Sequence, residues 1–250
     1  MKIKNVFVTA AMALATLLSV IGNSAMARDV SMAFGSFNPP YALPDTGDGI
    51  EVEIIREALA MSGYKMKPSF VPAKRLVHMF EQGTIDAVSK DMGDDMTDKG
   101  ALYGDVSVRY EDVIFTLKES NLNIEKPEDL KSLRIVAFQH AAKHYPDWLG
   151  PLVGTDDYTE VADQSQQVKM LHRGRADVIV ADRYIIQYYS NQIARENGTE
   201  LKPVGITNFA EPWGYRPAFR DEALRDSFND GLKKLIDSGH YQKIIDSYVN

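Results

Sequence analysis

Apolar residues follow two alternating patterns along most of this chain. In the helical pattern they recur every three or four positions: in 49–62, Val52, Ile55 and Leu59 share one face, and Gly63 follows as a stop signal. In the other pattern they form short continuous runs, typical of strands buried on both faces. The alternation predicts an α/β protein in which helices pack around largely parallel sheets.

The elements expected from these patterns can be given by residue range. Strands are expected at 29–36, 65–72, 85–89, 112–118, 134–138, 159–163 and 177–181, with an extended segment at 212–219. Helices are expected at 49–62, 73–82, 140–146, 165–174 and 183–197, and a last long helix should end at Gly239.

One phrase occurs twice: MFEQGTIDAVSKD at 79–91 and MLHRGRADVIVAD at 170–182. In each copy a Gly, Gly83 or Gly174, stands where a helix must end in a left-handed conformation. Each copy ends in an Asp at or just past the end of an apolar strand, where open α/β sheets bind ligands. The repeat therefore predicts one helix–Gly–strand unit in each of two lobes, with Asp91 and Asp182 directed at a shared cleft. The alternative is coincidence between ordinary αβ units.

The N-terminus resembles an export signal. Lys2 and Lys4 precede an uncharged apolar run at 6–21, and the small-residue motif at 25–27 fits a cleavage site. Residues 1–27 are therefore expected to be a cleaved signal peptide, which would leave a mature protein in the bacterial periplasm. An uncleaved membrane anchor is the alternative, although the apolar run is short for a span of roughly 20 residues.

Composition excludes several other classes of function. The formal net charge is −7 and no basic stripe is present, so nucleic acid is not an expected partner. The chain has no Cys, and no nucleotide-binding, metalloprotease or hydrolase motif occurs. His140 and His144 are four positions apart but have no third strong ligand, so neither a metal nor a cofactor is expected.

Five phrases together resemble the type II periplasmic solute-binding proteins, in particular the polar amino-acid-binding components of bacterial ABC importers. They are NPPYALPDTGDGIEVEIIREAL, VPAKRLVHMFEQGTIDAV, IEKPEDLKSLRIVAF, VKMLHRGRADVIVADRYI and LKKLIDSGHYQKIIDSY, which occur in the family's order. The resemblance implies two α/β lobes around a ligand cleft. The first lobe would comprise 28–110 and 212–250 and the second 111–211, with crossings near 109–112 and 209–214.

The resemblance also implies ligand-binding residues. Asp182 stands where the family's amino-acid binders hold the ligand ammonium, although it could instead only cap the following helix. The loop KDMGDDMTDKGALYGD, at 90–105, lacks the family's Arg for the ligand carboxylate and is acidic around Asp91. This loop indicates either a solvated turn or a preference for cationic solutes, and Arg75 is a possible substitute anchor.

Further cleft candidates lie at strand ends and at a crossing. Tyr41 follows the first strand and would contact a ligand or pack in its loop. Gln139 and His140 open a helix whose free N–H groups suit an anion, or they are ordinary capping residues. Trp213 would form either a cleft wall or hinge packing.

The leading hypothesis is a monomeric, non-enzymatic periplasmic receptor. It would bind a small polar solute, amino-acid-like or cationic, by hinge closure and deliver it to an inner-membrane ABC permease. A cleft enzyme of the lyase or dehydratase type, using Asp91 or His140, is an alternative. A sensory module that signals to a membrane kinase or chemoreceptor is another, because fold is shared more widely than function.

Overall fold

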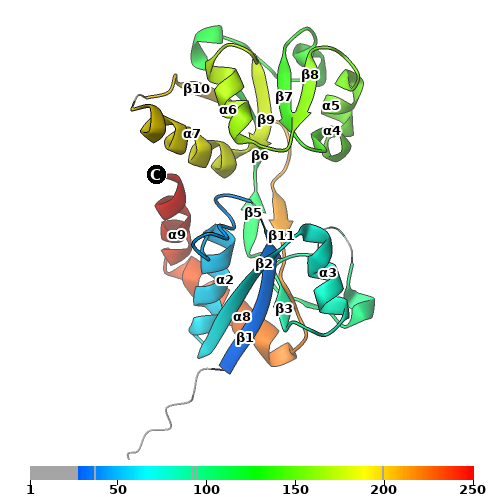
Figure 1. Ribbon diagram of the computed structural model, residues 1–250, viewed down its shortest axis with the longest axis vertical. Helices are drawn as coiled ribbons and strands as arrows, with labels where there is room; N and C mark the ends of the chain where they lie inside the picture. The colour runs from blue at the N-terminus through cyan, green and yellow to red at the C-terminus, as the bar shows by residue number, and fades with distance from the viewer. Residues whose placement is uncertain (1–27, 37, 92, 94, 199) are drawn as a thin grey trace, which may run out of the picture.

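The computed structural model describes residues 28–36, 38–91, 93, 95–198 and 200–250. The signal peptide expected at 1–27 lies outside the described residues. The chain forms two lobes, each built on a five-stranded sheet flanked by helices (Figure 1). The predicted two-lobed α/β fold class is confirmed.

The sheet of the first lobe has the strand order β2-β1-β3-β12-β4. Its strands are β1 (Arg28–Gly35), β2 (Tyr64–Val71), β3 (Ala87–Val88), β4 (Leu102–Tyr103) and β12 (Ala218–Phe219). Its helices are α2 (Ile50–Ala60), α3 (Ala73–Glu81), α8 (Glu222–Asp237) and α9 (His240–Val249). β1 pairs in parallel with β2 and β3, whereas β12 is antiparallel to β3 and β4.

The sheet of the second lobe has the strand order β10-β6-β9-β7-β8. Its strands are β6 (Asp112–Leu117), β7 (Ile135–Phe138), β8 (Tyr158–Val161), β9 (Val178–Asp182) and β10 (Val204–Asn208). Its helices are α4 (Ala141–His144), α5 (Pro146–Leu149), α6 (Ser165–His172) and α7 (Arg183–Asn197). β7 is parallel to β8 and β9, but β6 and β10 pair antiparallel. Each sheet is thus mixed, because one strand runs against the others: β12 in the first lobe, and β6, which pairs antiparallel with both β9 and β10, in the second.

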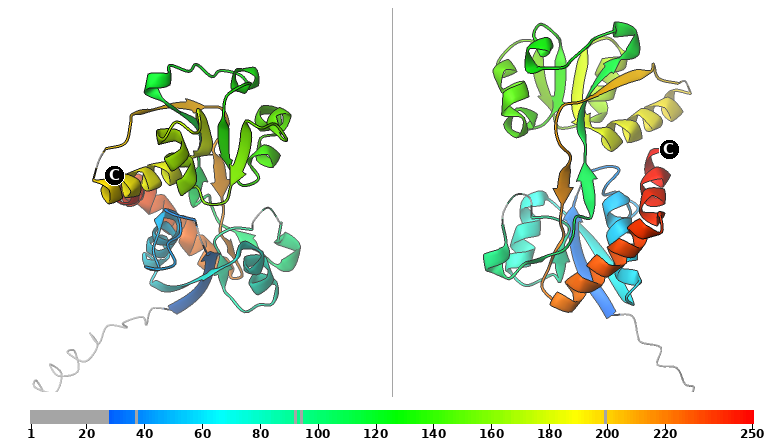
Figure 2. Two further views of the ribbon diagram at one scale, coloured as in Figure 1. Left: turned by 45° about the horizontal axis from the view of Figure 1, so that its top comes forward. Right: turned by 180° about the vertical axis from the view of Figure 1, so that it is seen from behind.

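The lobes are joined by two neighbouring segments of chain. One runs from β5 (Val108–Tyr110) into β6, and the other from β10 into β11 (Trp213–Tyr215). β5 and β11 form an antiparallel ribbon in which Trp213 pairs with Tyr110 and Tyr215 with Val108. Seen from behind, the two segments run side by side between the lobes (Figure 2).

The repeated phrase forms equivalent structures in the two lobes. Gly83 and Gly174, after α3 and α6, have φ of 67° and 66°, in the left-handed region that favours Gly. Three positions after each Gly, an Asp accepts a hydrogen bond from a backbone N–H of the neighbouring parallel strand segment. Asp86 accepts from Ser31 at 2.8 Å, and Asp177 from Arg134 at 2.9 Å. The phrase therefore marks the packing of one αβ unit per lobe.

The C-terminal segment differs from its expectation. The apolar stripe of α8 is buried as predicted, but the chain continues past Gly239 (φ 71°) into α9, which the sequence reading did not assign. The helix expected at 140–146 is present as the shorter α4, and Pro146, which cannot donate a backbone hydrogen bond, begins the separate helix α5. β4 and β10 were also not predicted as strands, since they are short or carry few apolar residues, whereas β5 overlaps the crossing expected near 109–112.

Candidate functional site

A cavity of about 370 Å³ lies between the lobes, against the crossing segments. Both lobes and both crossings contribute to its lining: Asp91, Gly93, Tyr110, Asp112, Phe138, His144, Gln164, Asp182, Ile185, Trp213, Gly214 and Tyr215. Both final carboxylates of the repeated phrase, Asp91 and Asp182, line it. Of the seven residues expected to bind ligand, Asp91, Asp182 and Trp213 are in this lining, whereas Tyr41, Arg75, Gln139 and His140 are not.

The carboxylate of Asp182 is buried, and donors from its own chain hydrogen-bond to both of its oxygens. Oδ1 accepts from the backbone N–H groups of Tyr184 and Ile185, both at 3.0 Å, and so caps α7. Oδ2 accepts from the Glu111 N–H at 2.8 Å and from the Tyr41 hydroxyl at 3.0 Å. The capping alternative is thus realised, and a role for Asp182 in contacting ligand stays a prediction.

Burial raises the pKa of Asp182 to about 7. The hydrogen bonds from the Ile185 and Glu111 N–H groups and from Tyr41 oppose this rise, whereas the negative charge of Asp112 adds to it. Asp182 therefore titrates near neutral pH.

Asp112 begins β6 directly opposite Asp182 on β9. Its Oδ2 accepts a hydrogen bond from the Tyr145 hydroxyl at 2.7 Å, and Oδ1 accepts none from the described residues. Burial raises the pKa of Asp112, while this hydrogen bond and nearby His144 lower it. Asp112 keeps an acceptor oxygen available at the cavity, and the sequence reading did not single it out.

The acidic loop after β3 supplies Asp91, whose Oδ1 accepts from the Gly93 N–H at 3.0 Å. The neighbouring Lys90 is 6% exposed and its ammonium lies 3.3 Å from the buried carboxylate of Glu51. The ammonium also donates to the Tyr110 hydroxyl at 3.2 Å and lies 4.4 Å from the ring centroid of Tyr215. Lys90 thus contacts Tyr110 and Tyr215 of the crossing ribbon and does not line the cavity.

Aromatic rings form much of the cavity wall. Trp213 on β11 is 51% exposed, and its ring lies edge-on to His144 of the second lobe, with centroids 6.2 Å apart. Tyr110 and Tyr215 meet at 4.7 Å in the ribbon. Aromatic faces on both sides of the crossings give a solute apolar contact and, if it is positively charged, cation–π attraction.

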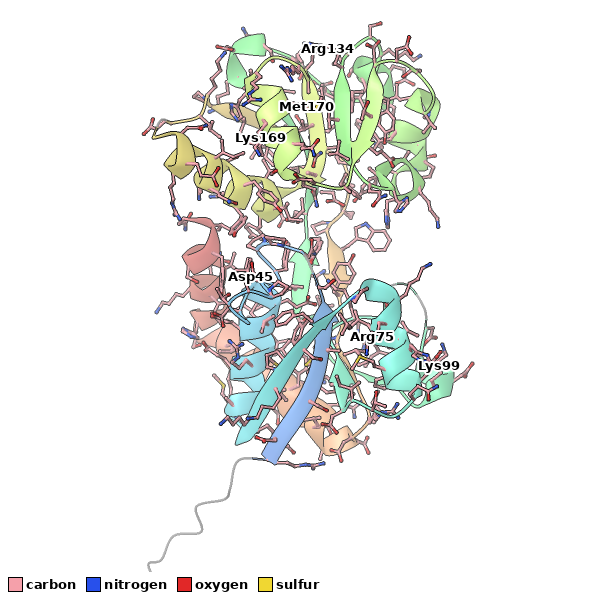
Figure 3. All side chains as sticks on the ribbon, viewed as in Figure 1. Asp45, Arg75, Lys99, Arg134, Lys169 and Met170 are labelled. Atoms are coloured by element: carbon pink, nitrogen blue, oxygen red, sulfur yellow. The ribbon has the colours of Figure 1, made fainter. Side chains whose placement is uncertain are left out.

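Tyr41 and Arg75 were expected to face the cleft, but neither lines the cavity. Tyr41 is 1% exposed, stacks on Tyr110 with centroids 3.8 Å apart, and donates to Asp182. It therefore packs beneath the crossing and ties the loop after β1 to the second lobe. Arg75 lies on the first turn of α3 in the first lobe with an exposed side chain (Figure 3). Ligand contact by either residue stays a prediction.

The expected anion site after β7 is filled by the protein itself. The N–H groups of His140 and Ala142 donate to the carboxylate oxygens of Glu160, at 2.7 and 2.9 Å. Gln139 and His140 are exposed, and the residues of this region that line the cavity are Phe138 and His144. Nothing in the segment 134–146 could have revealed this, since Glu160 comes from the neighbouring strand β8.

A second cavity, of about 350 Å³, adjoins the first on the side of the first lobe. It is lined by Asp91, Asp95, Thr97, Tyr103, Gly214, Tyr215 and Arg216, and it shares Asp91, Gly214 and Tyr215 with the first cavity. Arg216 follows β11, and the sequence reading did not single it out. Over the described ranges, no group of three or more His, Asp or Glu side chains is placed to hold a metal ion.

Comparison with known proteins decides the family. The family model for bacterial extracellular solute-binding proteins, family 3, matches residues 30–250. The chain belongs to this family. Family 3 membership confirms the resemblance found in the sequence and implies a periplasmic or extracellular location. In the part of the chain that the structure describes, no helix is both long and apolar enough to span a membrane.

Known proteins similar to this family 3 protein have modest sequence identity to it, and the solved structures among them share its fold. A probable histidine-binding protein of Neisseria gonorrhoeae is 24% identical over 219 residues, which cover 85% of this chain and 79% of the relative. The solved structure of an ancestral cationic amino acid solute-binding protein is 17% identical with a TM-score of 0.70, covering 89% of this chain and 96% of the other. A probable amino-acid ABC transporter extracellular-binding protein, YtmK from Bacillus subtilis, is 18% identical with a TM-score of 0.66, covering 89% and 99%.

Proposed function

We propose that this protein is a periplasmic receptor for a small, positively charged, amino-acid-like solute. It binds the solute between its lobes without chemical change and presents it to an inner-membrane ABC permease. The observation that carries the proposal is the charge of the interlobe cavity. Its described lining includes three carboxylates, Asp91, Asp112 and Asp182, and neither Lys nor Arg.

The three carboxylates do not contribute equally to solute binding. Asp182 already accepts four hydrogen bonds from the chain, so it would contribute through the field of its charge, and a bound cation would favour that charge by lowering the pKa from about 7. Asp112 keeps an oxygen that can accept directly from an ammonium or guanidinium group, and such a charge-assisted bond is strong in a partly buried site. A bound cation also favours the ionised form of Asp112, which opposes the effect of burial on its pKa.

Hinge closure follows from the position of the cavity. Its lining comes from the first lobe (Asp91), the crossings (Trp213) and the second lobe (Phe138). A solute that contacts both lobes binds the closed form more tightly and shifts the open–closed population toward it. Support for an importer as partner comes from family membership and from the transporter-associated relative.

The test is a titration of the mature chain, residues 28–250, with a panel of amino acids followed by tryptophan fluorescence. Arginine, lysine, ornithine and histidine are expected to bind, and glutamate and leucine are not. Trp213→Phe should remove most of the signal, whereas Trp148→Phe, which alters a tryptophan outside the cavity lining, should keep it. Recovery of the solute unchanged distinguishes a receptor from a cleft enzyme.

A matched pair of variants tests the carboxylate argument. Asp112→Asn should weaken binding of the cationic solute by about tenfold or more, because a hydrogen bond to a charged group is lost. Asp147→Asn changes an exposed carboxylate on α5 outside the cavity lining and should leave affinity unchanged. Exclusive binding of acidic or neutral solutes would contradict the proposal.

A further inference from the structure

We propose that Arg216 anchors a carboxylate of the bound solute, in a subsite formed by the second cavity. This inference rests on the proposed function, in which the first cavity holds the positive charge of the solute. The solute would then carry both charges, with its cation toward Asp112 and its carboxylate toward Arg216.

The two cavities are arranged for a solute of this kind. They share Asp91, Gly214 and Tyr215, so they are neighbouring parts of one cleft rather than separate sites. Among the described residues that line them, Arg216 is the single Lys or Arg. The first cavity contributes carboxylates and neither Lys nor Arg, whereas the second contributes the guanidinium of Arg216.

Internal contacts orient the Arg216 side chain. Its Nε donates to the Gly104 carbonyl oxygen at 2.7 Å, and its guanidinium carbon lies 5.6 Å from the ring centroid of Tyr103. The guanidinium is therefore fixed at its Nε edge by the Gly104 carbonyl and on one face by the Tyr103 ring. The terminal nitrogens make no hydrogen bond or ion pair with the described residues, and they present the forked geometry that pairs with a carboxylate.

Other cations near the cleft are less suited to this role. Lys90 is buried and paired with Glu51. Lys99 lies 2.6 Å from a carboxylate oxygen of Glu81, and Arg75 lines neither cavity. The acidic loop at 90–105 therefore lacks an available carboxylate anchor of its own, whereas Arg216, directly after β11, lines the second cavity with a guanidinium.

Asp91 and Asp95 also line the second cavity, and each has internal donors. Asp95 Oδ1 accepts from the N–H and the hydroxyl of Thr97, at 2.9 and 2.6 Å, and Asp91 Oδ1 accepts from the Gly93 N–H. Among the described residues, the hydrogen bond made by the Arg216 side chain is the one from Nε to the Gly104 carbonyl oxygen. The guanidinium thus remains available to an incoming anion.

The test compares solutes that differ only in the carboxylate. L-arginine is titrated against agmatine, and L-lysine against cadaverine, into the mature protein by calorimetry. Wild-type protein should prefer the carboxylate-bearing member of each pair. Arg216→Gln should weaken binding of the amino acid by about tenfold or more and leave the decarboxylated amine within about twofold. Arg216→Lys, which keeps the charge but loses the fork, should fall between the two.

Arg220 provides a matched control. Its Nε donates to a backbone carbonyl, Ile85 O, at 3.2 Å, and its guanidinium lies over the Phe80 ring at 4.3 Å, but it lines neither cavity. Arg220→Gln should therefore leave the preference for arginine over agmatine intact.

The outcomes separate this inference from the proposed function. If wild-type protein binds arginine and agmatine equally, or if Arg216→Gln weakens both to the same extent, Arg216 is not a carboxylate anchor while the cationic receptor stands. If no cationic solute of either kind binds, the proposed function fails and the inference fails with it. Selective loss of the amino acid in Arg216→Gln alone supports both.

Discussion

Two aspartates at opposite ends of one strand should respond to pH in opposite ways. Asp182 ends β9 at the cleft, and burial raises its pKa to about 7 from the ordinary 3.8. Asp177 immediately precedes β9, and the hydrogen bond from the Arg134 side chain lowers its pKa. Figure 3 places Arg134 at the end of the second lobe that faces away from the first. The perturbations are Asp182→Asn and Asp177→Asn, each of which removes one titrating group.

The sign for Asp182 follows from proton linkage. Its folded pKa lies above the unfolded value, so the folded state binds the proton more tightly. The stability it contributes is fully present below the unfolded pKa and is lost as pH rises through about 7. A pKa of about 7 against 3.8 corresponds to roughly 4 kcal/mol, which is the largest change expected between pH 4 and pH 8.

For Asp177 the sign is reversed. Its folded pKa lies below the unfolded value, so its contribution is present above the unfolded pKa and is lost as pH falls through the folded pKa. The free-energy difference between wild type and Asp177→Asn should be constant from pH 5 to pH 8 and should shrink in stronger acid.

The assay is guanidinium unfolding of the mature chain without solute, followed by circular dichroism at several pH values from 4 to 8. Acids that do not interact with the substituted residue titrate alike in wild type and variant, so the difference in unfolding free energy reports the substituted group and, for Asp182, its coupling to Asp112. The difference between wild type and Asp182→Asn should fall steadily with rising pH. A difference that is flat or increases over this range would refute a raised pKa for Asp182.

Two further predictions concern stability, both measured by chemical denaturation. Lys90→Met should lower the free energy of unfolding by roughly 3–5 kcal/mol, because Glu51, which is 1% exposed, is left buried without its partner. Adding Glu51→Gln should recover part of this loss. If the double variant recovers none of it, the pairing argument is wrong. Gly231→Ala should destabilise the protein, although Ala favours helices, because its Cβ would lie 2.0 Å from the Ala58 carbonyl oxygen; Gly35→Ala, where no atom lies within 4 Å, is the control.

Local sequence signals predicted the parts of this fold that depend on local physics. The repeated phrase predicted one αβ unit per lobe, and its Gly residues have the left-handed φ that this position requires. Asp182 follows an apolar strand and precedes a helix, so both its place at the cleft edge and its capping role were foreseeable. The extended segment expected at 212–219 contains β11 and β12, whereas the helix α9 was not foreseen because it comes after the apparent stop at Gly239.

The site residues that sequence reasoning missed are set by contacts between distant segments. Asp112 acquires its place because β6 pairs with β9, and Arg216 because β11 returns beside β5. The backbone N–H groups at the start of the helix at Ala141 were expected to suit an anion, but the carboxylate of Glu160 on a neighbouring strand already accepts their hydrogen bonds. In each case the decisive partner is far away in the sequence, and no local periodicity reports it.

These contacts between distant segments also assign Asp182 a structural role at the junction of the lobes. Its carboxylate joins three segments: the loop after β1 through Tyr41, the first crossing through Glu111, and the start of α7 through Ile185. The first of these belongs to the first lobe and the last to the second, so any rotation of the lobes about the crossings must either carry this junction intact or break the Tyr41 bond. Because both oxygens of Asp182 already accept two hydrogen bonds each, at least one of these would have to break before Asp182 became the main acceptor for a solute, and direct ligand contact stays a prediction. On the proposed function, we therefore expect the charge selectivity of the cleft to depend mainly on Asp112 and Asp91 for the cation and on Arg216 for the anion, and we expect Asp182 to link occupancy of the cleft to the geometry of the hinge.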